Sequence, residues 1–181
     1  MVCIGRIFLI ADCHFGNEDV IRVFRRPFVT VAEMDRVMAG NWNLAVGPDD
    51  TVIVAGDFTY DPEDRERLLH TLNGNKILIR GNHDRGGKEV GGDTMVLAYR
   101  GTMLFLVHNP DHAPSGWDGW IVHGHCHGGR LDYPFIDGEK RTINVACERV
   151  NYTPVDIDWI FALDPATILR METIDAEPER H

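Results

Sequence analysis

The stretch RIFLIADCH (residues 6–14) joins a short apolar run to Asp12 and His14, and the same combination recurs along the chain. The further runs, each with the polar residues that follow it, are TVIVAG (51–56) before Asp57, KILIRG (76–81) before Asn82, His83 and Asp84, TMLFLV (102–107) before His108, and GWIVHG (119–124) before His125 and His127. Short runs rich in Ile, Val and Leu are typical of buried strands. The pattern predicts strands whose ends carry polar side chains.

Helical patterns separate the first three runs. Residues 30–33 (TVAE) form a capping box, and Val31, Met34 and Met38 follow at helical spacing. Residues 61–64 (DPED) are a second start signal, with a capping Asp, a Pro at the first helical position and acids in the first turn. The order β-α-β-α-β predicts parallel strands, and ligands bind beyond the carboxyl ends of such strands.

The second half of the chain predicts a different arrangement of strands and helices. Residues 93–99 and 102–107 flank a tight Arg100-Gly101 link and predict a hairpin. We expect a strand over 141–145, a short helix over 154–163 and a final strand over 167–171. The predicted fold class is α/β, a single domain over residues 1–172 with two packed sheets, followed by a charged tail, 173–181, that frays.

Composition limits the function classes. The 181 residues carry a formal net charge of -10, so the surface as a whole should repel a long nucleic-acid duplex, although not a small phosphate ester near a local cation. The four cysteines form no CxxC pair and indicate a reducing, cytosolic setting. No apolar run approaches the ~20 residues that span a bilayer, and the oligomeric state stays open.

Each polar cluster alone has an ordinary explanation, such as a turn or a hydrogen-bonded core histidine. Together, the five strand ends collect carboxylates, a carboxamide and imidazoles at one rim, where unpaired charge costs several kcal/mol and a bound cation compensates it. Nitrogen and oxygen donors without thiolate suit Mn, Fe, Zn, Ni or Co in a hydrolytic site. A set of more than four ligands indicates two divalent ions. Among these metals, we expect manganese.

These motifs resemble the calcineurin-like metallophosphoesterases, whose pattern is DxH, GDxx, GNH(D/E), a lone His and GHxH. The matching stretches here are 12–14, 56–57, 81–84, His108 and 124–127, in the family order. HFG, RRPF, EMDRVMAGNWN, DTVIVAGDF and NVACERVNYTPVDID further resemble a small bacterial and archaeal subgroup of predicted phosphoesterases. At position 17 this sequence has Asn where the subgroup is expected to have His. Because residue 17 lies outside the five motifs, this difference puts a substrate contact in doubt more than metal binding.

The resemblance implies two stacked mixed β-sheets flanked by helices in four layers, α/β/β/α. It also implies two sets of metal ligands that share Asp57. The first set is Asp12, His14, Asp57 and His127, and the second is Asp57, Asn82, His108 and His125. His83 would act as an acid at the leaving oxygen, and Asp84 would either orient that imidazole or cap the next turn. Two cations ~3.5–4 Å apart can share a hydroxide and neutralise phosphoryl charge.

Other residues near the motifs have competing interpretations. Arg25 and Arg26 either clamp a phosphate or form a solvated pair beside a turn. Trp42 is expected to pack a helix, Cys13 and Cys126 to face inward, and His123 to be structural or to support a ligand.

The predicted function is a metal-dependent phosphodiesterase acting on a small or nucleotide-like ester. A phosphomonoesterase or a nuclease with the same site is the alternative within the class, and the net charge counts against the nuclease. A metallo-β-lactamase-type hydrolase lacks its HxHxDH pattern here. A catalytically silent metal-binding scaffold for protein assembly is the alternative outside it, and the presence of His83 argues against that scaffold.

Overall fold

The computed structural model describes residues 5–84, 91–128 and 133–180, and its strands form two mixed sheets. The four-stranded sheet has the order β3-β2-β1-β9, with β1 at Ile7–Ile10, β2 at Thr51–Ala55, β3 at Asn75–Ile79 and β9 at Val155–Asp156. β1, β2 and β3 are parallel, as the alternation of strands and helices predicts, whereas β9 is antiparallel to β1. The first three strands therefore end at the same edge.

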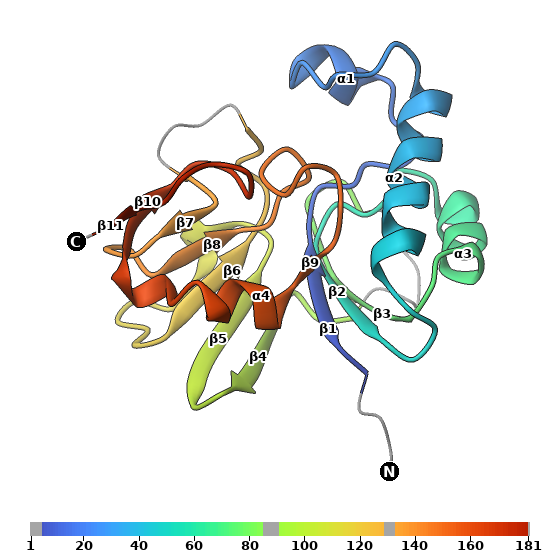
Figure 1. The fold of residues 1–181 in the computed structure, drawn as a ribbon. Helices are drawn as coiled ribbons and strands as arrows, with labels where there is room; N and C mark the ends of the chain where they lie inside the picture. The colour runs from blue at the N-terminus through green and yellow to red at the C-terminus, as the bar shows by residue number, and fades with distance from the viewer. Residues whose placement is uncertain (1–4, 85–90, 129–132, 181) are drawn as a thin grey trace.

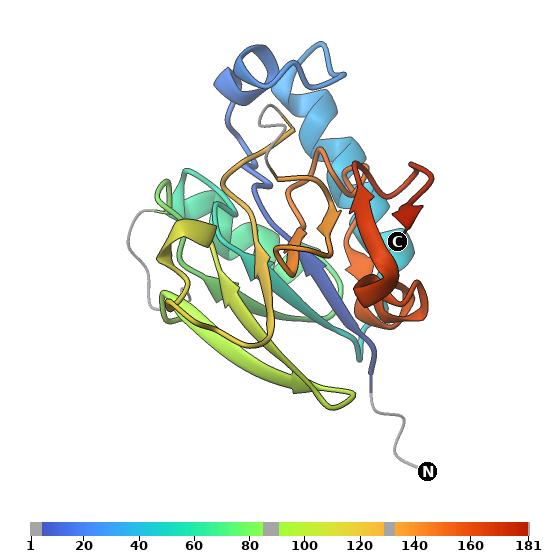
Figure 2. The same ribbon diagram turned by 90° about the vertical axis from the view of Figure 1, so that its left-hand side faces the viewer.

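The seven-stranded sheet has the order β11-β10-β7-β8-β6-β5-β4. Its strands are β4 (Thr94–Tyr99), β5 (Thr102–Val107), β6 (Trp120–His123), β7 (Ile136–Asp137), β8 (Thr142–Asn144), β10 (Ile168–Met171) and β11 (Glu179–Arg180). β5, β6 and β8 run parallel, while β4 and β5 form the predicted antiparallel hairpin at the sheet's edge (Figure 2).

Helices α2 (Val31–Ala45) and α3 (Pro62–Thr71) lie on the outer side of the four-stranded sheet (Figure 1). The Thr30 hydroxyl accepts a hydrogen bond from the Glu33 N–H at 3.2 Å and caps α2. Met34, Met38 and Trp42 follow every fourth residue and are buried in the core. The Asp61 carboxylate caps α3 by accepting from the Glu63 N–H at 2.9 Å. Both helices begin where the sequence predicts.

The fourth helix, α4 (Ile157–Ala162), is shorter than the predicted span of 154–163. Asp156 accepts from the Asp158 N–H at 2.8 Å, and a capping residue adopts an extended backbone. Val155 and Asp156 therefore pair with the free edge of β1 as β9, which the sequence prediction missed. α4 packs against the seven-stranded sheet through Phe161, whose ring centre lies 5.4 Å from that of Tyr99.

The segment 173–181, expected to fray, contains a short strand at residues 179–180. Glu179–Arg180 forms β11 against β10, and the Arg180 guanidinium donates to the Leu163 carbonyl. Two further elements were not predicted, the short helix α1 (Asp19–Val23) and β7, because such short elements carry no readable periodicity. Single-turn 3-10 helices at Pro110–His112 and Pro165–Thr167 complete the described structure.

The two sheets meet at the carboxyl end of β1. The Ala11 N–H donates to the Val145 carbonyl at 2.8 Å, and the Cys147 N–H donates to the Ala11 carbonyl at 3.0 Å. These bonds connect the residues after β1 to those after β8, across the two sheets. The loops that follow the strands of both sheets are consequently gathered in one region.

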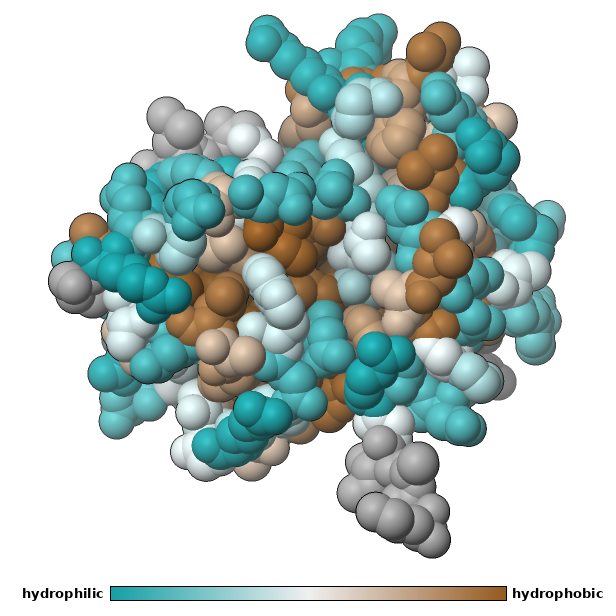
Figure 3. Space-filling model, viewed as in Figure 1, coloured by the Kyte–Doolittle hydropathy of each residue, from teal (hydrophilic) through white to brown (hydrophobic). Residues whose placement is uncertain are grey.

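The face seen in Figure 3 is largely hydrophilic, with hydrophobic residues grouped over and beside α4, where Trp159 is exposed. Within the described ranges, none of the helices has the length and apolar composition that crossing a membrane requires.

Candidate metal centre

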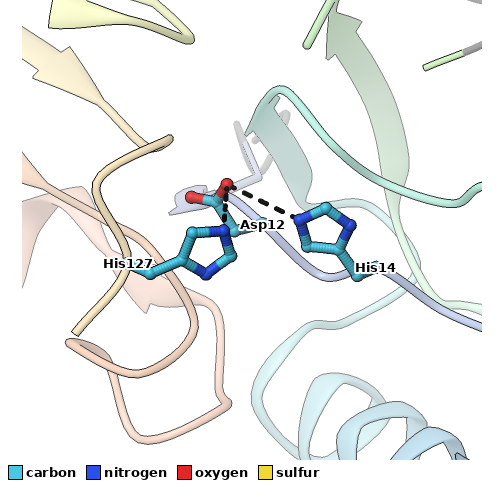
Figure 4. Close-up of side chains that lie close together, drawn as sticks. All are labelled: Asp12, His14 and His127. Carbon is cyan, nitrogen blue, oxygen red and sulfur yellow. Dashed lines mark ion pairs between the residues drawn. The ribbon is translucent and has the colours of Figure 1, made fainter. Parts of the chain in front are cut away.

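Asp12 is the centre of a first group of side chains, drawn in Figure 4. Its Oδ1 lies 3.5 Å from His127 Nε2 and 3.9 Å from His14 Nε2. All three side chains are buried, although they come from the loops after β1 and β6, in different sheets. Their donor atoms lie close enough together to surround one ion.

Asp57 connects this group to a second one. Its Oδ2 lies 3.4 Å from His14 Nε2 and 3.2 Å from His108 Nε2. Its Oδ1 accepts a hydrogen bond from the His83 N–H at 2.8 Å, which fixes the carboxylate plane. One oxygen of Asp57 thus faces imidazoles of both groups.

The second group is completed by the amide oxygen of Asn82. This Oδ1 atom lies 2.9 Å from His108 Nε2 and 2.9 Å from His125 Nδ1. The opposite nitrogen of His108, Nδ1, lies 3.0 Å from the Ala55 carbonyl and donates to it, so that Nε2 faces Asp57 and Asn82. Asn82 is exposed and His125 half-buried, so this group opens to the surface.

The chemistry of the donor set fits divalent cations. Asp12 Oδ1 and His14 Nε2 are buried and have no hydrogen-bond partner among the described residues, which is costly unless an ion satisfies them. Burial raises the pKa of Asp12 to about 6 and lowers that of His14 to about 3. An adjacent cation would stabilise the carboxylate, and the neutral His14 offers a lone pair.

Asp57 and His108 stabilise each other as an ion pair in the metal-free protein. Burial opposes both charges, but the hydrogen bond and the attraction between them lower the pKa of Asp57 to about 2 and raise that of His108 to about 9. Metal binding would release the imidazole proton, because a ligating histidine is neutral.

The backbone around the candidate ligands is strained. Non-glycine residues with positive φ include five of the predicted ligands, with φ between 42° and 65°: Asp12, His14, Asp57, His125 and His127. A left-handed backbone at such residues costs on the order of 1 kcal/mol each and persists where the surrounding structure enforces it. The strain turns successive strand ends toward one point, as at other functional sites.

Two glycines allow the carboxylates to approach the neighbouring backbone. A Cβ atom on Gly124 would lie 2.4 Å from Asp12 Oδ2, and one on Gly81 would lie 2.1 Å from Asp57 Oδ1. Asp12 Oδ2 also accepts a hydrogen bond from the His125 N–H at 2.8 Å. These glycines are required because a side chain would occupy the space of a carboxylate oxygen.

His83 and Asp84, predicted as catalytic, lie at the site but in different settings. His83 is exposed, and its ring centre is 5.3 Å from that of His14. Asp84 does not orient His83 in the structure. Its carboxylate accepts hydrogen bonds from the N–H groups of Asp57 at 2.8 Å, Phe58 at 3.0 Å and Gly81 at 2.8 Å. Asp84 therefore clamps the loops after β2 and β3 together, and its catalytic role stays a prediction.

Arg25 and Arg26, predicted as substrate contacts, also differ from each other. Arg25 is exposed with φ 54°. Arg26 is buried, and its guanidinium donates to the carbonyls of Cys13 at 2.9 Å and Asp12 at 2.6 Å and to the Glu148 carboxylate at 2.8 Å. These bonds make Arg26 part of the support beneath the site, in contrast to the expected phosphate clamp.

Glu148 was not predicted as a site residue. Its Oε1 lies 3.1 Å from His127 Nδ1. The run TINVAC (142–147) before it begins with β8, so an acid follows a strand here as polar residues follow the other five. The family resemblance implies no metal ligand at this position.

The remaining residues singled out from the sequence are not among the metal donors. His123 is fully buried with Nδ1 2.9 Å from the Gly124 carbonyl, and Trp42 packs within the core, both as structural residues. Cys13 and Cys126 are buried as predicted. Asn17 lines a cavity of about 570 Å³ beside His14 and His83.

The sequence and the fold both match known proteins. The sequence model of the calcineurin-like phosphoesterases matches residues 5–166. An uncharacterized protein of Methanocaldococcus jannaschii is 40% identical over 163 residues, which cover 87% of this chain and 90% of that protein. The gene 66 protein of Mycobacterium phage L5 is 34% identical over 80 residues, 41% of this chain and 37% of that protein. The crystal structure of a protein of unknown function from Aquifex aeolicus matches with a TM-score of 0.69 at 25% identity, covering 88% of this chain and 99% of that one.

The chain belongs to the calcineurin-like phosphoesterase family. It is a metal-dependent hydrolase that acts on phosphoric ester bonds. Its candidate metal-binding residues include two overlapping groups, Asp12, His14 and His127, and Asp12, Asp57 and His108.

Proposed function

We propose that the protein is a phosphodiesterase with a dinuclear metal centre. The first ion would be held by Asp12, His14, Asp57 and His127, and the second by Asp57, Asn82, His108 and His125. The position of Asp57 Oδ2, within 3.4 Å of His14 Nε2 and 3.2 Å of His108 Nε2, supports its role as the shared ligand. When bound, the two ions would activate a water molecule as the nucleophile and neutralise phosphoryl charge.

The observation that favours a diester is that cavities flank the metal donors on two sides. One cavity, of about 570 Å³, is lined by His14 and His83. The other, of about 320 Å³, is lined by Asn82, His108 and His125. A phosphodiester carries an organic group on each of two ester oxygens, whereas a monoester carries only one. Two cavities offer room for both groups.

Charge around the donors also favours a diester. A diester has one negative charge on its phosphate, whereas a monoester has close to two at neutral pH and needs additional cationic partners. Among the described residues that line the larger cavity, none is a lysine or an arginine, and Glu18 and Asp19 are present. The smaller cavity contains Arg80, but this side chain pairs with Asp93 at 3.2 Å.

His83 is suited to protonate the leaving oxygen. The Asp57 carboxylate holds its backbone N–H at 2.8 Å, while its imidazole remains exposed at the larger cavity. An imidazole at this position can donate a proton to a departing alkoxide as a general acid. We place the leaving group in this cavity and the second organic group in the smaller one.

The test is a comparison of bis-p-nitrophenyl phosphate, p-nitrophenyl phosphate and 2′,3′-cyclic nucleotides, each with Mn, Ni, Co, Zn and Mg. We expect diester hydrolysis with Mn or Ni that chelation and Asp57→Ala both abolish. Hydrolysis that survives chelation and this substitution would refute the metal-dependent mechanism. A preference for the monoester across all metals would refute the diester assignment alone.

A further inference from the structure

His127 is held between a carboxylate on each side of its ring. Its Nδ1 lies 3.1 Å from Glu148 Oε1, and its Nε2 lies 3.5 Å from Asp12 Oδ1. A hydrogen bond from Nδ1 to a carboxylate requires the proton on Nδ1, which leaves the Nε2 lone pair directed toward Asp12 and His14. Glu148 thus selects the tautomer that a metal ligand needs.

Glu148 is in turn fixed by Arg26. The Arg26 Nε donates to Glu148 Oε1 at 2.8 Å, and its two terminal nitrogens donate to the Asp12 and Cys13 carbonyls. The side chain of Arg26 is 0% exposed and that of Glu148 is 8% exposed. The pair therefore connects the backbone at Asp12 to the imidazole at residue 127 through buried, charge-assisted bonds, which are short and directional.

Phe24 restricts the same imidazole from a third direction. Its ring lies 3.5 Å from that of His127, with 9° between the planes. With Nδ1 bonded to Glu148 and one face covered by Phe24, the ring can neither flip nor tilt freely. The orientation of Nε2 is fixed before any ion arrives.

His108, in the second group of donors, is supported by a neutral acceptor. His108 Nδ1 lies 3.0 Å from the carbonyl of Ala55, which is a neutral acceptor. His125 Nδ1 faces Asn82 Oδ1 directly at 2.9 Å. Because a carboxylate raises the basicity of the imidazole it supports more than a neutral carbonyl does, Glu148 should strengthen His127 as a ligand more than the Ala55 carbonyl strengthens His108.

We infer that Glu148, held by Arg26, is a positioning residue for His127 and selectively raises the affinity of the ion bound by Asp12, His14 and His127. This inference rests on the proposed two-ion function. It assigns Glu148 no contact with substrate, since the residue acts through His127.

The experiment compares Glu148→Ala and Glu148→Gln with the wild type, in the full chain. The matched control is Glu172→Gln, which breaks different ion pairs, with Arg149 at 3.3 Å and Arg170 at 2.5 Å, and touches none of the metal donors in the described contacts. Each metal-free protein is titrated with Mn²⁺ against a competing chelator, and bound metal is counted by mass spectrometry. We expect Glu148→Ala to weaken one of the two ions about 10–100-fold and to leave the other within about threefold. Glu148→Gln should lose less metal affinity, because its amide oxygen can still accept a hydrogen bond from His127 Nδ1.

A second measurement separates positioning from general stability. ¹⁵N NMR of the metal-free protein should show His127 protonated at Nδ1 in the wild type and in Glu172→Gln, and a mixture of tautomers in Glu148→Ala. Unchanged affinity for both ions, or equal weakening of both with an unchanged tautomer, would overturn the inference. A wild-type protein that binds fewer than two ions would instead refute the proposed function.

Discussion

The Oδ2 atom of Asp57 lies 3.2 Å from Nε2 of His108, although the two residues follow strands of different sheets. Asp57 comes after β2 and His108 after β5. The contact exists only because the sheets pack with the carboxyl ends of these strands together, held by the hydrogen bonds between Ala11 and the residues after β8. The packing of the two sheets therefore also brings the metal donors together.

This contact makes a prediction for Asp57→Asn. Because the carboxylate raises the pKa of His108 to about 9 in the metal-free protein, its removal should lower that pKa. NMR titration of the histidines without metal measures the change. The variant should also lose at least about 100-fold in metal affinity. An unaltered His108 pKa would show that the pair does not form in solution.

His83→Ala should keep both ions and lose turnover. A general acid contributes about 10²–10⁴-fold, and the loss should be smallest for esters with good leaving groups, which need no proton. Metal content and rates on nitrophenyl and alkyl diesters test this. His70→Ala, on the exposed surface of α3, is the control and should behave as wild type. Loss of both ions in His83→Ala would mean that His83 has a ligand role.

Gly124→Ala should displace Asp12, because the new Cβ atom would lie 2.4 Å from its Oδ2. We expect metal binding to fall by at least about tenfold. Gly40→Ala is the matched control, since a Cβ atom there meets nothing within 4 Å in the middle of α2. That control should bind metal normally and gain about 1 kcal/mol in unfolding free energy. Equal metal affinity in the two variants would contradict the steric argument.

Asp84→Ala should destabilise the protein even without metal. Its carboxylate accepts three backbone N–H groups at 2.8–3.0 Å, and leaving them unsatisfied costs on the order of 2 kcal/mol or more. Chemical denaturation of the metal-free protein measures this. A variant that retained wild-type stability and lost only activity would instead support the catalytic role predicted for Asp84.

The buried His123 should make the metal-free protein less stable in mild acid. Burial lowers its pKa to about 4 from the usual 6.5, so between these values the unfolded chain binds a proton that the folded protein does not. Stability from this residue is present above pH 6.5 and is lost as the pH falls toward 4, by about 3 kcal/mol in total.

His123→Asn isolates this contribution from other titrating groups. Asp12 acts in the opposite sense, because its pKa is raised to about 6 and its protonation relieves a buried charge. The difference in unfolding free energy between wild type and His123→Asn should therefore change between pH 6.5 and 4. A constant difference would show that His123 is protonated in the folded state.

The local sequence pattern was sufficient to predict much of the fold. The runs 51–56 and 102–107, the Thr30 cap and the Asp61 cap act over a few residues, and each appears in the structure at the expected place. β9 and β11 could not be read in this way. Val155–Asp156 and Glu179–Arg180 are strands only because the edges of β1 and β10 accept them.

The sequence by itself determined which side chains could bind metal, because strand periodicity and the residues at each strand end are properties of neighbouring positions. It also determined the family, because each family motif consists of neighbouring residues. Only the tertiary structure decided how the two sheets bring those ends together, that Asp84 and Arg26 hold backbone, and that Glu148 lies behind His127. These are contacts between residues distant in sequence, such as the 122 positions from Arg26 to Glu148, and packing alone creates them.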